Sequence, residues 1–221
     1  MSGRRADQGS RARFSDRCAA GRELASRLEH LRAAQPVVLA LPRGGVPVAV
    51  EIADALEAPL DVILVRKLGV PTQPEWAMGA IGEGGVVVLN EDVVAAAAVS
   101  GADLASVRTR EVDELRRRTE RYRHGTAPIP VHGRTVIVVD DGIATGATAE
   151  AAAEVIAVQR PARIVMAAPV APPRVVARLQ QRVDEVVVLH TPEPFEAVGI
   201  WYDDFRPITD AEVEEMIRAA R

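Results

Sequence analysis

The sequence predicts an α/β fold in which helices cover both faces of a mostly parallel, five-stranded core sheet. Short runs of β-branched and aliphatic residues alternate with stretches of helical periodicity along the chain. Strands that alternate with helices imply right-handed crossovers and hence parallel neighbours in the sheet. Apolar residues make up 48% of the 221 residues but only seven residues are aromatic, a composition that suits buried parallel strands under Ala-rich helices.

The first third of the chain predicts helices and strands in turn. Residues 1–13 are polar and Arg-rich, and we expect them to form a disordered tail. Ser15 is a candidate N-cap for a helix over residues 16–31, because Leu24, Leu28 and Leu31 recur there at helical spacing. The elements expected next are a strand over 37–41, a tight turn over 42–45, a helix over 46–56 and a strand over 60–65.

The middle of the chain predicts structure outside the parallel sheet. Residues 68–74 contain Pro and Gly without periodicity and predict a loop, whereas residues 77–81 and 86–89 flank a Gly-rich turn and predict a hairpin. Residues 103–124 predict a long, heavily charged helix with one narrow inner side. That inner side is expected to carry Val112, Leu115, Thr119 and Tyr122.

The last third returns to alternating strands and helices. Strands are expected over 136–139, 164–170 and 185–189, with an Ala-rich helix after the first and a short helix opening at Pro172 and Pro173 after the second. Thr209 and Glu212 form a capping-box pattern at the start of the last helix. Neither an internal repeat nor a low-complexity linker divides the chain, so we expect a single domain over residues 14–221.

Composition excludes several classes of partner. A net charge near −4 gives no electrostatic argument for binding to nucleic acid or to an anionic membrane. Cys18 is the single cysteine, which excludes an internal disulfide and makes a reducing cytoplasm the expected location. No apolar run approaches the roughly 20 residues of a membrane span. We therefore expect a soluble, cytoplasmic protein.

The residues that follow the strand over 136–139 form the most informative motif. Asp140 and Asp141 lead directly into a Gly- and Thr-rich loop over 142–148, and a helix begins at once. Free N–H groups and the positive end of the helix dipole favour a bound anion there, and two carboxylates can accept hydrogen bonds from sugar hydroxyls. The loop is not a Walker A loop, because no Lys follows Gly146. A strand end with merely solvated aspartates would leave the Thr-Gly-x-Thr spacing unexplained, so the pattern predicts a phosphate-and-sugar site.

This stretch resembles the phosphoribosyl pyrophosphate (PRPP) binding motif of type I phosphoribosyltransferases, and the resemblance covers about residues 14–215. It implies the Rossmann-like fold of that family, with a small hood and a flexible loop or hairpin beside the core sheet. It also implies that Asp140 and Asp141 hold the ribose hydroxyls. The loop residues expected to hold the 5′-phosphate are Gly142, Ile143, Ala144, Thr145, Gly146, Ala147 and Thr148. Sequences such as Phe14-x-Asp16-Arg17 look like those of an uncharacterised bacterial branch.

Two further segments at strand ends resemble functional loops of the family. Pro42-Arg43-Gly44-Gly45 resembles the pyrophosphate loop, in which Arg43 and the amides of Gly44 and Gly45 bind the leaving group and a cis non-proline peptide can occur; a simple turn is the alternative. Arg66 and Lys67 resemble the flexible catalytic loop, and a basic pair at a surface strand end is the alternative. Because ligands gather at the carboxyl ends of parallel strands, we expect the three segments to converge.

Two observations concern the acceptor. Trp201 and Tyr202 follow the last core strand, where the family places a hood, and stacking on a nucleobase, core packing and a dimer contact all remain open. Ala144 stands where the hypoxanthine/guanine/xanthine branch usually carries a third acid that serves the purine N7. Because a missing general acid–base group costs about 10²–10⁴-fold in rate, a 6-oxopurine acceptor is disfavoured.

The resemblance implies a Mg²⁺-dependent enzyme that transfers the ribosyl 5-phosphate of PRPP to a nitrogenous, nucleobase-like acceptor and releases pyrophosphate. Mg²⁺ is expected to bind mainly through PRPP, with Asp140 and Asp141 as candidate protein ligands. A second copy of the chain is the expected protein partner, in a homodimer. A regulatory protein that senses PRPP or a nucleotide on the same fold is the alternative function.

Overall fold

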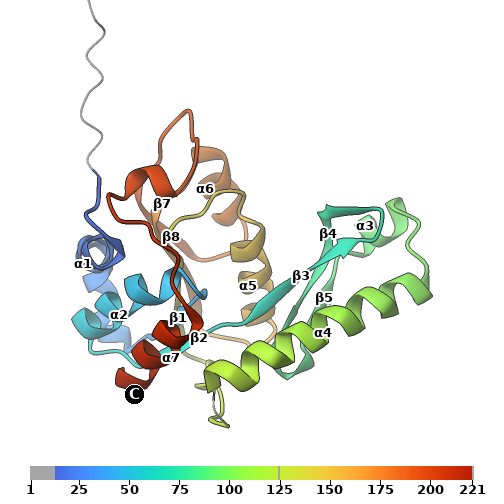
Figure 1. Cartoon of the computed structure of the whole chain (residues 1–221), viewed down its shortest axis with the longest axis horizontal. Helices are drawn as coiled ribbons and strands as arrows, with labels where there is room; N and C mark the ends of the chain where they lie inside the picture. Colours follow the sequence, from blue (N-terminus) through green and yellow to red (C-terminus); the bar gives the residue numbers. More distant parts are fainter. Residues whose placement is uncertain (1–12, 124, 221) are drawn as a thin grey trace, which may run out of the picture.

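A five-stranded, all-parallel sheet forms the core of the protein, as the sequence predicted. The computed structural model describes residues 13–123 and 125–220, so the tail expected over residues 1–13 lies outside the described residues except for Arg13 (Figure 1). The strand order is β2-β1-β6-β7-β8, with every neighbouring pair parallel. The strands are β1 (Val37–Ala40), β2 (Leu60–Val62), β6 (Thr135–Val139), β7 (Arg163–Val170) and β8 (Glu185–His190).

Helices cover both faces of this sheet. Val38 and Ala40 of β1 point to one face, where they pack in one cluster with α1 (Arg17–Leu28), α2 (Gly45–Leu56) and α7 (Asp210–Ala219). Val37 and Leu39 point to the other face and pack with α5 (Ala147–Ala157) and α6 (Pro173–Leu179). Because successive side chains of a strand alternate between faces, a strand that is covered on both sides must be apolar at every position.

A three-stranded antiparallel sheet projects from the core and carries a long helix along one side (Figure 1). Its strands are β3 (Val65–Val70), β4 (Gln73–Gly82) and β5 (Val87–Leu89), and the chain continues through α3 (Glu91–Ala96) into α4 (Gly101–Arg123). We call residues 65–123 the arm. The hairpin expected around residues 82–85 is confirmed as the β4–β5 pair.

The arm corrects two predictions. The strand expected over 60–65 ends at Val62, and the loop expected over 68–74 is β3 and the start of β4, joined by a turn at residues 71 and 72. Leu68 and Val70 alternate along β3 and are buried in the cluster that includes Val107 and Leu115 of α4. The Pro and Gly residues of this segment obscured that two-residue alternation.

A buried ion cluster holds the base of the arm against β2. Arg123, the last residue of α4, donates from Nη1 to both carboxylate oxygens of Asp61 at 2.8 Å. Its Nε donates to Glu83, just after β4, at 2.6 Å, and its Nη2 donates to the carbonyl oxygen of Val62 at 2.9 Å. The Arg123 and Asp61 side chains are only 5% and 1% exposed. One guanidinium therefore joins the end of α4 and the residue after β4 to the core strand β2.

One of the predicted helix N-caps is wrong and one is confirmed. The N-cap of α1 is Asp16, whose carboxylate accepts from the Ala19 N–H at 2.7 Å, instead of the expected Ser15. The capping box of Thr209 and Glu212 at α7 is confirmed.

The predicted inner side of α4 is confirmed in part: Leu115 and Tyr122 are buried as expected, whereas Val112 and Thr119 are half-buried. Across residues 13–123 and 125–220, none of the helices is long and apolar enough to cross a membrane.

Candidate phosphate and sugar site

Two of the three predicted segments lie against each other at the carboxyl ends of β1 and β6. The Leu41 N–H donates to the Val139 carbonyl oxygen at 2.8 Å, which joins the start of one loop to the end of the neighbouring strand. A Cβ atom on Gly44 would lie 2.0 Å from Oδ2 of Asp141, and one on Gly45 would lie 2.5 Å from the Val139 carbonyl oxygen. Only glycine leaves room for this approach. The Pro42–Arg43 peptide bond is cis.

The loop after β6 forms a backbone cradle at the start of α5. The Ile143 N–H donates to the Val170 carbonyl oxygen of β7 at 2.8 Å, which ties the loop to the sheet edge. Gly146 is the N-cap of α5 with φ +86° and has no capping side chain, and the Ala147 N–H at the start of α5 donates to the Thr145 hydroxyl oxygen at 3.4 Å. Thr145 and Thr148 are exposed beside them. This arrangement is suited to a phosphate group.

The two acidic side chains lie in different surroundings. Asp140 accepts the Asp141 N–H at 2.9 Å, and burial together with the neighbouring Asp141 raises the pKa of Asp140 well above its ordinary value. Asp141 accepts from Nε of Arg17 at 2.7 Å. Burial raises the pKa of Asp141 as well, and the Arg17 guanidinium opposes that shift. Arg17 has no predicted role in the site, although the sequence places it in a branch-specific segment.

The segment after β8 packs beneath the acidic pair. Trp201 and Tyr202 are 7% and 4% exposed and belong to a small apolar cluster with Phe14. The Trp201 ring stacks on His190 with a centroid separation of 5.2 Å. The Tyr202 hydroxyl donates to the Asp141 carbonyl oxygen at 2.5 Å. Of the alternatives for this aromatic pair, the structure shows core packing, and contact with an acceptor stays a prediction.

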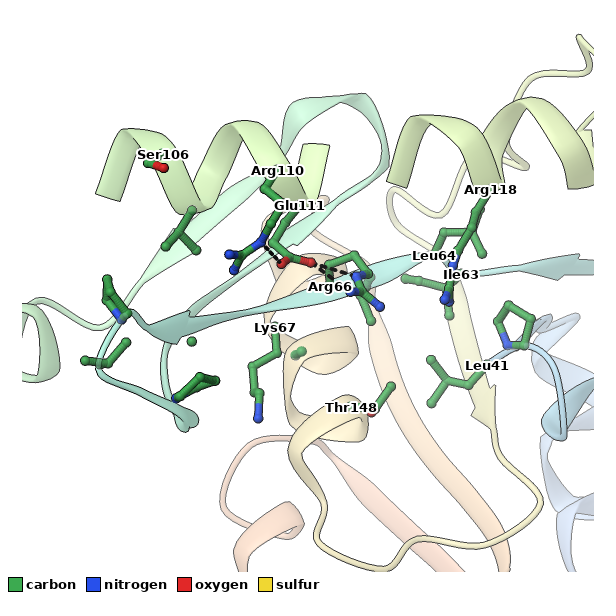
Figure 2. A pocket seen from close by; sticks show the side chains of 18 of the residues that line it. Leu41, Ile63, Leu64, Arg66, Lys67, Ser106, Arg110, Glu111, Arg118 and Thr148 are labelled. Atoms are coloured by element: carbon green, nitrogen blue, oxygen red, sulfur yellow. Dashed lines mark hydrogen bonds and ion pairs between the residues drawn. The ribbon is translucent and has the colours of Figure 1, made fainter. Parts of the chain in front are cut away.

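The third predicted segment meets the other two at a cavity of about 550 Å³ between the arm and the core (Figure 2). Pro42 and Thr148 line the core side of this cavity, and Arg66 and Lys67 of β3 line the arm side. Figure 2 shows Arg66 reaching toward Glu111 of α4, while Lys67 projects from β3 toward the side on which Thr148 lies. The Nε atom of Arg66 donates to Glu111 at 2.9 Å. Both cationic residues therefore lie on a paired strand and not on the expected loop.

Two arginines that the sequence did not single out as functional reach the site. Arg17 comes from α1, and Arg178 of α6 donates from Nη2 to the Thr145 carbonyl oxygen at 2.5 Å and from Nε to Glu150 at 2.9 Å. Arg43 is about half exposed at the mouth of its loop. In the part of the chain that the structure describes, no group of three or more His, Cys, Asp or Glu could hold a metal ion. Asp140 and Asp141 carry hard oxygen donors directly before the phosphate loop.

A parallel sheet with an acidic pair, a glycine-rich loop and a second glycine loop at neighbouring strand ends has the architecture of the type I phosphoribosyltransferase fold. The family described as "Phosphoribosyl transferase domain" matches residues 16–193, and the chain belongs to this family.

Similar proteins support this assignment. Two curated Mycobacterium tuberculosis proteins, each named "Putative phosphoribosyl transferase", are 53% identical over 200 residues, which make up 90% of this chain and 45% of theirs. The chain thus spans about half the length of these relatives. The crystal structure of TT1426 from Thermus thermophilus is 48% identical, with a TM-score of 0.87 over 93% of this chain and 97% of that chain.

Proposed function

We propose that the protein is a Mg²⁺-dependent phosphoribosyltransferase that moves the ribosyl 5-phosphate of PRPP to an acceptor nitrogen and releases pyrophosphate. The observation that carries the proposal is the contact between the two glycine-containing loops. Asp141 lies directly over Gly44, so groups suited to ribose and groups suited to pyrophosphate are held side by side. Membership of the phosphoribosyl transferase family supports PRPP as the donor.

Each end of PRPP has a matching part of the site. The backbone of residues 142–148 and the Thr145 and Thr148 hydroxyls would hold the 5′-phosphate at the N-terminus of α5. The acidic pair would accept hydrogen bonds from the ribose hydroxyls and offset positive charge on the sugar. Arg43 and the amides of Gly44 and Gly45 would bind the pyrophosphate.

The reaction breaks the bond between ribose C1 and a pyrophosphate oxygen and forms a bond from C1 to the acceptor nitrogen, which then loses its proton. Negative charge grows on the leaving pyrophosphate as the bond breaks. Lys67, Arg43 and the loop amides would stabilise this charge, an electrostatic contribution that is often the largest in catalysis. Asp140 and Asp141 carry the hard oxygen donors that Mg²⁺ prefers, and the bound ion would neutralise further phosphate charge.

The acceptor is proposed to be nucleobase-like but not a 6-oxopurine. Ala144 is exposed in the phosphate loop and cannot donate or accept a proton. The expected homodimer, the cytoplasmic location and the contact of Trp201 and Tyr202 with the acceptor stay predictions.

The deciding assay is release of pyrophosphate from PRPP with Mg²⁺ across a panel of nitrogenous bases. Release with at least one base supports the proposal, whereas tight PRPP binding without release for any base indicates the PRPP sensor instead. Asp140→Asn combined with Asp141→Asn should abolish PRPP binding in calorimetry, because neither amide offers two anionic acceptors to the ribose. Unchanged affinity in this double variant, with an unchanged circular dichroism spectrum, would contradict the assignment of the site.

A further inference from the structure

Arg17 is held rigidly beneath the acidic pair. It is the first residue of α1 and is 7% exposed. Its Nε donates to Oδ2 of Asp141 at 2.7 Å and its Nη1 donates to the Arg206 carbonyl oxygen at 3.0 Å. The guanidinium carbon lies 4.0 Å from the centre of the Phe205 ring, a cation–π contact. These three contacts together restrain the Arg17 guanidinium to one position.

Asp141 is in turn held from three directions. Arg17 binds its carboxylate, the Tyr202 hydroxyl donates to its carbonyl oxygen, and Gly44 lies directly against its Oδ2 atom. The same oxygen that accepts from Arg17 would meet a Cβ on Gly44 at 2.0 Å. The Asp141 carboxylate therefore fills the space between the phosphate-and-sugar loop and the pyrophosphate loop.

Asp140 has no such restraint. Its carboxylate accepts the Asp141 N–H, and within residues 13–123 and 125–220 no cation forms an ion pair with it. Two adjacent carboxylates repel each other when both are ionised, and a buried carboxylate without a partner is unfavourable. Pairing Asp141 with Arg17 relieves that repulsion and leaves Asp140 to face a ligand.

We propose that Arg17 is a positioning residue for PRPP: it clamps Asp141 against Gly44, fixes the two loops relative to each other, and leaves Asp140 as the acid that takes the ribose hydroxyls. The inference rests on the proposed PRPP-binding function. A merely structural ion pair would predict a lower melting temperature without a change in PRPP affinity, so the two roles have different consequences.

A double-mutant cycle tests the proposal. PRPP affinity is measured by calorimetry with Mg²⁺, well below the melting temperature, for Arg17→Gln, Asp141→Asn and the two combined. Each single variant should bind PRPP about tenfold or more weakly, and the combined variant should bind no more weakly than the weaker single variant, because both changes remove one interaction. Arg22→Gln is the matched control: this arginine is also on α1 and pairs with Glu51 of α2, but it is exposed. Its PRPP affinity should equal that of the wild type.

Two results would contradict the proposal. Wild-type PRPP affinity in Arg17→Gln would overturn it, and so would fold-changes that multiply in the combined variant. If Arg17→Gln fails to fold, Arg17→Lys takes its place in the cycle and the same criterion applies. A wild-type protein that does not bind PRPP contradicts the proposed function itself, and this outcome is distinct from wild-type binding that Arg17 does not influence.

Discussion

Gly44 and Asp141 show how a single contact sets the shape of the site. Gly44 has φ −61°, a value that any residue adopts, so its backbone conformation does not require glycine. What requires glycine is space, because the Asp141 carboxylate occupies the position of a Cβ atom. Because Gly44 has no side chain, the two loops can pack directly against each other although they are distant in sequence.

Gly44→Ala is expected to impair the site. The added methyl group would displace Asp141 or the pyrophosphate loop, and a displacement on the order of 1 Å can lower kcat/KM for PRPP by about 10²-fold. The free energy of unfolding should also fall, by about 1–3 kcal/mol, because the substitution overpacks the contact. Steady-state kinetics and urea unfolding measure the two effects. Gly101→Ala is the control, since its Cβ would meet no atom within 4 Å, and an equal loss there would contradict the explanation.

The sequence predicted the residues of local motifs and missed those that reach the site from afar. Asp140, Asp141 and the Gly44-Gly45 pair were found because their neighbours in sequence carry the pattern. Arg17 is separated from Asp141 by 124 positions, and nothing in the local sequence indicates which carboxylate an arginine at the start of a helix will meet. Such contacts follow only from the packed fold.

At the scale of elements, β3 changes the interpretation of Arg66 and Lys67. The sequence indicated a flexible loop because Gly69, Pro71 and Pro74 interrupt any periodicity. In the structure the segment pairs with β4, and its register is irregular around Gly69. Because a strand sends successive side chains to opposite sides, Arg66 is directed to Glu111 while Lys67 is directed toward the phosphate loop.

Lys67→Ala should lower turnover far more than PRPP affinity. Charge on the leaving pyrophosphate grows only as the bond breaks, so a cation that stabilises it acts mainly on kcat, and its loss is expected to cost about 10²-fold or more. Single-turnover kinetics and calorimetry with PRPP separate the two quantities. A loss of PRPP affinity with an unchanged single-turnover rate would instead assign Lys67 to ground-state binding alone.

The capping box of α7 predicts a pH dependence. The hydrogen bond from Arg206, followed by those from Thr209, lowers the pKa of Glu212 to about 2. A carboxyl whose pKa is lower in the folded state stabilises the fold above its unfolded pKa of about 4.3, and this stability is lost as the pH falls toward the folded pKa. The melting temperature of the wild type should therefore exceed that of Glu212→Gln at pH 7, and the difference should shrink between about pH 5 and pH 2. A difference that is constant over this range would contradict the predicted role of ionised Glu212.

At the scale of the whole molecule, the protein consists of a sheet core and an arm, which a buried ion cluster and apolar packing of β3 and β4 join to each other. The alternation of strands and helices was sufficient to predict the core, because the central strands β1 and β6 are buried at every position and almost entirely apolar. The arm was only partly predictable, since its hairpin and helix are visible in the sequence but their attachment includes a pair between Asp61 and Arg123, which are distant in sequence.

Arg123→Met should weaken this attachment strongly. Removal of the guanidinium takes away the cation that donates two hydrogen bonds to the buried Asp61 carboxylate, and breaking a buried pair from one side costs about 3–5 kcal/mol. Chemical denaturation followed by circular dichroism measures the change in the free energy of unfolding. Arg116→Ala on the same helix is the matched control: its pair with Glu120 is exposed, so the change should be within about 1 kcal/mol. Similar losses in both variants would show that burial does not decide the effect.

The position of Lys67 on the cavity wall has a practical consequence, because it is the single lysine of the whole sequence. Reductive methylation with isotope-labelled formaldehyde modifies amines and leaves guanidinium groups unchanged. It would place one side-chain label on this protein, at the border between arm and core. The α-amino group of the chain terminus is the other kind of amine that the reagent modifies. One carbon signal would then report directly on closure of the cavity around an added phosphate ester.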